Sequence, residues 1–124
     1  MPYYQQSSRP LWVVLALAAS ACGGVPLNQS KLAQAQDAVH VAETLGAEQD
    51  PKAQQSLQLA RDQVARAKSL GADGDGEEGD LFLARATADA ELASQLMRTR
   101  SEAEKAREAW AKSQSIGGPG QAQQ

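Results

Sequence analysis

The stretch that decides the fold is residues 50–71, which read DPKAQQSLQLARDQVARAKSLG. Asp50 is a residue type that caps helix N-termini, and Pro51 fits the first helical position, where a missing N–H costs no hydrogen bond. Apolar residues then follow at the three- and four-residue spacing of one helix face, namely Ala53, Leu57, Ala60, Val64, Ala67 and Leu70. The pattern predicts a helix over residues 51–70 that ends at Gly71.

The same spacing predicts one helix on each side of this stretch. The first covers residues 30–46 and ends at Gly46. Either Asn28 or Ser30 caps it. Its apolar face consists of Leu32, Ala35, Val39, Ala42 and Leu45. The last helix covers residues 80–113, and the apolar face of its first half consists of Leu81, Ala84, Ala88, Leu92 and Leu96.

Three segments of the chain after residue 21 do not fit a helical pattern. Residues 22–29 contain glycine and proline, which oppose helix formation, and we expect them to form a short tether. Residues 71–79 alternate glycine with acidic residues and are expected to form a flexible loop. This loop does not match an EF-hand, because Glu78 occupies the position of the obligatory glycine. Residues 114–124 are rich in glycine and glutamine and are expected to be disordered.

The predicted architecture is all-α: an antiparallel three-helix bundle, or helical hairpin, with a long third helix. Aromatic residues make up only 4% of the chain, so alanine must build much of the core. The short link between the first two helices predicts that they are antiparallel neighbours. At 1.5 Å per residue the third helix is about 50 Å long, against roughly 30 Å for each of the others. Its second half should therefore project beyond the bundle.

A narrow apolar stripe runs along the projecting half of the third helix. It consists of Ala103, Ala106 and Trp110, which lie amid charged residues. Tryptophan is enriched at the centre of protein interfaces, and an overhanging tryptophan stays exposed unless something covers it. The alternative is that Trp110 folds back on its own bundle or simply lies on the surface. We expect the stripe to bind a partner, either another envelope protein or a second copy of the chain.

The first 21 residues have the order of a secretory signal peptide. A polar start with the charge of Arg9 precedes the apolar run of residues 11–19, and small residues continue to position 21. The apolar run is too short to span a bilayer, which takes about 20 residues. Residues 1–21 are therefore expected to be cleaved and are left out of the predicted fold.

The only cysteine in the chain, Cys22, follows directly. Ala19-Ser20-Ala21-Cys22 resembles the lipobox of bacterial lipoproteins, in which the cysteine becomes the lipidated first residue. One departure is that Ala19 stands where leucine is usual. The resemblance implies a lipid anchor on Cys22, and Gly23 in place of aspartate implies the outer membrane, facing the periplasm. The alternative is ordinary cleavage at the same bond, which would give a soluble secreted protein with a free thiol.

The helical part of the chain resembles a family of proteobacterial lipoproteins, the domain of unknown function 4398 family. Its members carry alanines every three or four residues in two or three helices after a lipobox. The matching residues here are Ala35, Ala38, Ala42, Ala60, Ala67, Ala84, Ala88 and Ala93. The resemblance covers most of residues 28–112. It implies a fold and a location but no mechanism, because the family carries no established activity.

Composition and motifs argue against catalysis and nucleic-acid binding. The net charge is −3 and no basic stripe could follow phosphates, so we expect no nucleic-acid partner. His40 is the single histidine, and no second histidine or available cysteine accompanies it as a metal ligand. The sequence carries no phosphate-binding loop and no nucleophile motif. We therefore expect no enzyme activity, no metal and no cofactor.

These observations predict a membrane-anchored periplasmic lipoprotein that acts as a non-enzymatic helical scaffold or binding module of the cell envelope. The alternative is a TPR-like helical adaptor, which would bind a peptide or protein in a groove between its helices. A TPR pair takes about 34 residues, which the first two helices approximate. Its large aromatic positions, however, are missing here.

Overall fold

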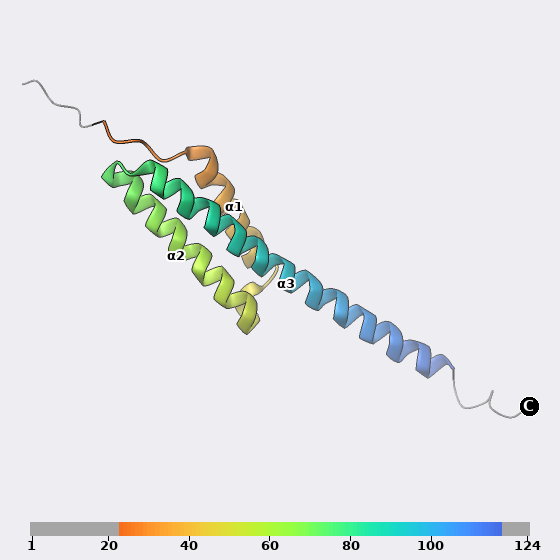
Figure 1. The fold of residues 1–124 in the computed structure, drawn as a ribbon. Helices are drawn as coiled ribbons and strands as arrows, with labels where there is room; N and C mark the ends of the chain where they lie inside the picture. Colours follow the sequence, from red (N-terminus) through yellow and green to blue (C-terminus); the bar gives the residue numbers. More distant parts are fainter. Residues whose placement is uncertain (1–22, 118–124) are drawn as a thin grey trace, which may run out of the picture.

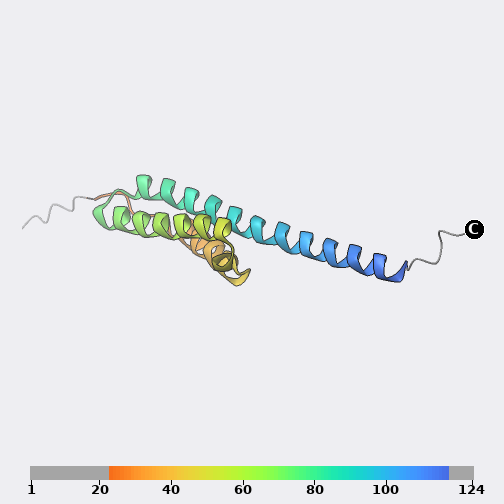
Figure 2. The ribbon, with the colours of Figure 1, turned by 90° about the horizontal axis from the view of Figure 1, so that it is seen from below.

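The computed structural model describes residues 23–117, which form three α-helices and one short 3₁₀ helix (Figure 1). In chain order the elements are α1 (Gln29–Thr44), η1 (Ala47–Gln49), α2 (Pro51–Asp73) and α3 (Gly76–Ile116). The helices pack as a bundle at one end of α3, and α3 continues beyond it (Figures 1 and 2). The predicted all-α bundle with a long third helix is confirmed.

The helix starts and the first turn follow the predicted capping chemistry. Asn28 Oδ1 accepts hydrogen bonds from the backbone N–H groups of Ser30 and Lys31, at 3.0 and 3.1 Å. Of the two predicted caps for α1, the structure therefore uses Asn28. Asp50 caps α2 in the same way, with Pro51 at the first helical position. Gly46 follows the end of α1 in the left-handed conformation, at φ 83°, which glycine adopts without strain.

The predicted flexible loop over residues 71–79 is wrong. α2 continues past Gly71 to Asp73, and α3 begins at Gly76 instead of at residue 80. The chain reverses within two residues, because Gly74 adopts the left-handed conformation at φ 90°. The other glycines of this stretch are helical, and they allow close packing against the segment before α1. A Cβ on Gly76, for example, would collide with the backbone of Val25 and Pro26.

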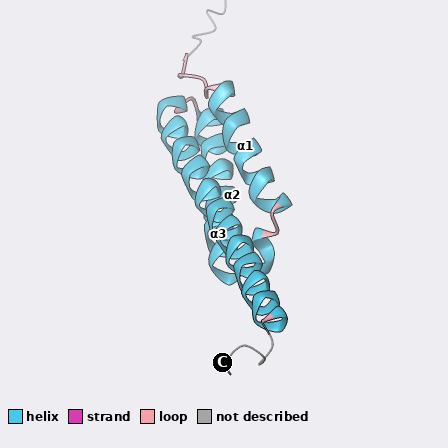
Figure 3. Cartoon of the chain, turned by 90° about the vertical axis from the view of Figure 1, so that its right-hand side faces the viewer, coloured by secondary structure: helices cyan, strands magenta, loops and turns pink. Residues whose placement is uncertain are grey.

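The three helices bury a core made largely of alanine. α3 packs most extensively against α2, and α1 packs mainly against α3 and less against α2. The first two helices are antiparallel as predicted, but α3 is the common neighbour of both (Figure 3). The buried apolar residues of the helices are Ala35, Ala42, Ala53, Leu57, Ala60, Val64, Ala67, Leu70, Leu83, Ala86, Ala90 and Ala93. The predicted face of α2 is confirmed at every position. Of the predicted face of the first helix, Ala35 and Ala42 are buried, whereas Leu45 is the C-cap of α1 and is exposed.

The predicted buried face of α3 is wrong at every position except Leu96, which is partly buried against the core. Leu81 and Leu92 are 62% and 50% exposed, and the side chains that enter the core are instead Leu83, Ala86, Ala90 and Ala93. Helix α3 carries two apolar faces, and the one richer in alanine packs inward. Small side chains let helix axes approach closely, which favours the alanine face in a bundle this thin. Leu81 and Leu92 lie on the opposite side of the helix and stay exposed.

The projecting part of α3 is confirmed. Every residue from Arg98 to Gly117 is exposed. At 1.5 Å per residue, the helical part of this overhang is about 28 Å long. We call residues 98–116 the overhang and residues 76–97 the bundle half of α3.

Candidate interaction surface

The predicted partner residues lie on a continuous exposed side of α3. Ala103, Ala106 and Trp110 are all exposed, and Trp110 is 67% exposed without folding back on the bundle. At 3.6 residues per turn, they share one side of the helix with the leucines that were predicted to be buried. We call this side the outer face and define it by Leu81, Ala88, Leu92, Thr99, Ala103, Ala106 and Trp110. It runs for about 44 Å.

Leu81 and Leu92, together with Ala84 and Ala88, are therefore surface residues that the sequence analysis assigned to the buried face. The sequence contained the information for the correct assignment, because residues 76–97 carry two sets of apolar residues at helical spacing. One helix cannot bury two opposite faces in a bundle whose other helices lie on one side of it. Only the packing of α1 and α2 decides which set remains exposed.

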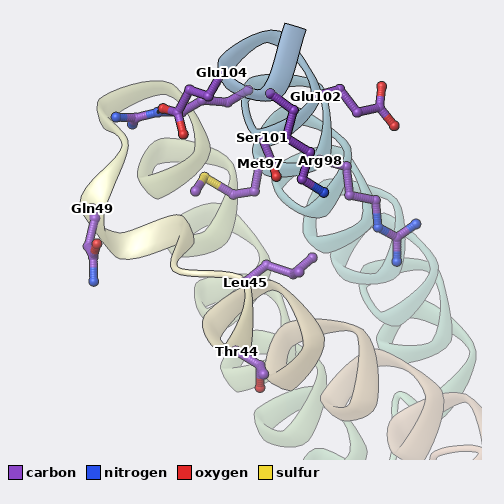
Figure 4. Close-up of a pocket in the computed structure, with 10 residues that line it drawn as sticks. Thr44, Leu45, Gln49, Met97, Arg98, Ser101, Glu102 and Glu104 are labelled. Atoms are coloured by element: carbon purple, nitrogen blue, oxygen red, sulfur yellow. The ribbon is translucent and has the colours of Figure 1, made fainter. Parts of the chain in front are cut away.

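A hollow marks the place where α3 leaves the bundle (Figure 4). It consists of two open parts of about 620 and 580 Å³, and Arg98 lines both of them. One part is lined by charged residues of α3, including Glu102 and Glu104, and by Leu45 and Gln49. The other part lies between α1 and α3 and is lined by Ala38, Val41, Ala88, Glu91, Leu92, Ser94 and Gln95. The second part joins the outer face.

Arg100 fixes the base of the overhang to the bundle. Its Nη1 lies 3.2 Å from Asp50 Oδ2, and its Nε lies 3.0 Å from Glu104 Oε1. These two carboxylates, Glu104 foremost, raise the pKa of Arg100. The pKa of Asp50 is lowered, first by the hydrogen bond from the Ala53 N–H and also by Arg100. Arg100 therefore joins α3 to the N-cap of α2.

The opposite end of the molecule holds the chain that leads into α1. The backbone N–H of Gly76 donates to the carbonyl oxygen of Val25 at 2.9 Å. Leu27 is 9% exposed and belongs to the core, together with Val64, Ala67 and Leu83. The described part of the predicted tether is thus packed against the α2–α3 turn and held in place.

Asp80 completes this attachment. Its Oδ1 accepts a hydrogen bond from the backbone N–H of Asn28 at 2.9 Å, and its Oδ2 lies 3.2 Å from Lys31 Nζ. The Asn28 N–H, followed by Lys31, lowers the pKa of the Asp80 carboxyl. Asp80 was predicted to begin the last helix, but it lies inside α3 and joins α3 to the start of α1.

The predicted absence of a metal site concerns His40 and the acidic side chains of the described chain. The His40 side chain is 80% exposed, and its Nδ1 lies 3.9 Å from Glu43 Oε2. Within residues 23–117, no three histidine, cysteine, aspartate or glutamate side chains gather closely enough to hold a metal ion. Cys22 lies outside the described residues, as do the predicted signal peptide and residues 118–124.

Comparison with known protein families gives a match over most of the described chain. A family model described as Domain of unknown function (DUF4398) matches residues 30–109, which include α1, α2 and most of α3. No curated protein and no solved structure matches the chain. None of the helices in residues 23–117 is long and apolar enough to cross a membrane.

Proposed function

Because the chain belongs to the DUF4398 family, and its family domain is a bundle with one exposed helical arm, we propose a scaffolding function for it. In this proposal the protein is a membrane-anchored periplasmic lipoprotein. Lipid on Cys22 holds it at the cell envelope. Gly23 in place of aspartate favours the outer membrane. The overhang binds a partner, and no catalysis is involved.

The observation that carries this proposal is the placement of the two ends of the domain. Val25 and Leu27, which follow Cys22 closely, are fixed against the α2–α3 turn. Trp110 lies near the other end of α3, more than thirty residues from that turn. At 1.5 Å per residue, the 41 residues of α3 span about 60 Å.

An anchor at Cys22 would have almost no slack between the lipid and the bundle. The turn end of the bundle would then lie at the membrane surface, and the outer face near Trp110 would be held away from it. A rigid arm of this kind reduces the orientations that a partner must search, which lowers the entropic cost of binding. This is the physical advantage that a helical scaffold gains from a packed tether.

Lipid attachment is tested by expressing the full chain in a bacterium that lipidates exported proteins. Cells are fed a clickable fatty acid, and the membrane and soluble fractions are compared for the parent and for Cys22→Ser. We expect label and membrane location for the parent only. A parent protein that is unlabelled and soluble would support the secreted alternative and would remove the anchor from the proposal.

The orientation is tested by fluorescence in vesicles that carry a quencher in the lipid headgroups. Trp110 is the only tryptophan after residue 21, so its emission reports on the overhang alone in cleaved protein. We expect little quenching of Trp110 and strong quenching of a tryptophan placed by Val25→Trp in a Trp110→Phe background. Equal quenching at both positions would contradict an arm that points away from the membrane.

The binding role is tested with a photo-crosslinking residue placed at either of two neighbouring positions of the overhang. Trp110 lies on the outer face, whereas Ala111 lies about 100° further round the helix. We expect discrete crosslinked products in whole cells from position 110 and few from position 111. Equal products from both positions would indicate chance encounters and would contradict a specific surface.

A further inference from the structure

We propose that the outer face of α3 pairs with the same face of a second copy of this chain, as a parallel, in-register coiled coil over residues 92–113. This inference deepens the proposed function by naming the partner of the overhang. It does not depend on the lipid anchor, because it concerns only residues within α3.

The first observation is a heptad pattern on the exposed side of the helix. Leu92, Leu96, Thr99, Ala103, Ala106, Trp110 and Ser113 follow one another at alternating steps of four and three residues. Sustained four–three spacing is the pattern by which two helices pair along a seam. All of these residues are exposed except Leu96, which is partly buried against the bundle.

The bundle itself uses a second pattern of the same kind. Gly76, Gly79, Leu83, Ala86, Ala90, Ala93 and Met97 alternate steps of three and four residues and face α1 and α2. The two seams are offset by one residue, as in Leu92 and Ala93, which is about 100° round the helix. The outer seam continues beyond the bundle over residues 99–113, where every residue of α3 is exposed and a second chain can pack beside it.

The charged residues beside the outer seam favour a second copy of the same chain in parallel orientation. Glu102 directly precedes Ala103, and Arg107 directly follows Ala106. In a parallel coiled coil these are the flanking g and e positions, and a g residue meets the e residue five places later in the partner. Glu102 of each chain would therefore meet Arg107 of the other, giving two opposite-charge pairs. Among residues 23–117, neither forms an ion pair within its own chain.

The same charges disfavour an antiparallel pair. In that orientation e positions meet e positions, and aligning Ala103 with Ala106 would bring Arg107 towards Arg100 of the partner. Like charges across a helix pair are destabilising. The parallel pair avoids this contact. It also places the two docked N-terminal segments at the same end, as two chains anchored in one membrane would require.

The side chains of the seam allow close approach but bury little apolar area. Alanine at positions 103 and 106 lets the helix axes come together, and the two Trp110 rings would meet across the seam. Thr99 and Ser113 add hydroxyl groups. Association should consequently be weaker than that of a seam with leucine at every d position, and Ala106→Leu should strengthen it.

The decisive experiment is a charge exchange measured by sedimentation equilibrium on the full chain, purified in detergent. The parent is expected to be in monomer–dimer equilibrium. Glu102→Arg and Arg107→Glu each convert two attractive pairs into two repulsive ones, and each should weaken association by about tenfold or more. The double variant should return to the parental affinity. Lys112→Glu, a charge change away from the seam, should leave the affinity unchanged.

Mixing the two single variants gives the sharpest outcome. Each variant alone places like charges across the seam, but a mixed pair restores both attractions. We therefore expect a mixed dimer at concentrations where each single variant is monomeric. A partner other than this chain, or an antiparallel pair, would not give this restoration. A parent that stays monomeric, or a mixture that fails to associate, would overturn the proposal.

A second measurement separates pairing from folding. Helicity by circular dichroism should be equal in all of these variants, since the exchanged residues are exposed. Trp110→Ala should reduce association by at least about tenfold, whereas Ala106→Leu should increase it. If Ala106→Leu leaves association unchanged, position 106 does not lie in a seam and the register is wrong. The lipid and crosslinking tests of the scaffold function remain independent of these results.

Discussion

The two halves of α3 belong to one unbroken helix but are held in place by different forces. The bundle half buries Leu83, Ala86, Ala90 and Ala93 against α1 and α2, with each of these four side chains completely buried. The overhang has no buried residue, and its helix is supported by alanine content, by local pairs such as Arg100 with Glu104 and, at its base, by the ion pair of Arg100 with Asp50. The same covalent helix therefore contributes to the domain core in one half and presents a surface in the other.

The largest expected difference between the two halves is in the free energy of unfolding after a side chain is truncated to alanine. Leu83→Ala leaves a cavity at a fully buried position and should lower the free energy of unfolding by about 3 kcal/mol. Trp110→Ala removes a larger side chain that is 67% exposed and should change the free energy by less than about 0.5 kcal/mol. Urea unfolding followed by circular dichroism measures both changes. Low protein concentration keeps self-association from contributing.

Leu92→Ala sharpens that comparison within the bundle half. Leu92 is half-exposed on the outer face, and its loss should cost far less than the loss of Leu83. Equal costs for the two leucines would mean that the outer face is covered in the folded monomer. That result would contradict the division of α3 into an inner and an outer seam.

The next effect comes from filling the alanine face. Ala90 is fully buried where α3 packs against its neighbours, so Ala90→Leu should destabilise the domain by about 1–3 kcal/mol through overpacking. Ala111 lies three heptads further along the same side of the helix but is exposed. Ala111→Leu should leave the unfolding midpoint unchanged. A tolerated leucine at position 90 would show that the core is looser than its closely packed alanines indicate.

Sequence reasoning predicted α2 and the helix caps well because those features depend on local chemistry. The Asp50 cap, the proline after it and the apolar face of α2 can all be read within one stretch of chain. Asn28 and Gly46 likewise act through neighbouring residues. Local patterns of this kind depend on residues that lie close together in the chain.

The α2–α3 turn and the inward face of α3 could not be predicted because they depend on distant residues. Glycines at positions 71, 76 and 79 resemble a flexible loop in the sequence, but they make room for Val25, Pro26 and Leu27. The sequence contains both apolar faces of α3, and only the position of α1 and α2 selects between them. For the candidate surface, Ala103, Ala106 and Trp110 were predicted to be on the overhang, whereas its extension to Leu81 was missed.

A smaller loss of stability is expected at low pH, where Asp50 and Asp80 become protonated. These aspartates hold α3 to the start of α2 and to the start of α1. The pKa values of Asp50 and Asp80 are lowered in the folded protein, chiefly by hydrogen bonds from the backbone N–H groups of Ala53 and Asn28. Their stabilising contribution is therefore present above about pH 4, the ordinary aspartate pKa, and is lost as the pH falls through the lowered values. Thermal unfolding should show a falling midpoint below about pH 4.

The double variant Asp50→Asn with Asp80→Asn separates these two carboxyls from the others. It should have a lower unfolding midpoint than the parent at neutral pH. The difference between the two midpoints should narrow as the pH falls, because the parent then loses the same charges. If the difference between the two midpoints stayed constant across the acidic range, the stabilisation would come from contacts that do not require ionised aspartate.

The smallest global effect should come from weakening the helix itself in the overhang. Ala106→Gly costs about 1 kcal/mol of local helix stability by propensity alone. Because Ala106 is exposed and lies beyond the Arg100–Asp50 ion pair, this loss should appear as faster amide exchange near position 106, with the global unfolding midpoint unchanged. Ala90→Gly, the matched change in the bundle half, should lower the global midpoint as well. If both substitutions lowered it equally, the overhang would be folding together with the core, and it could not be an independent arm.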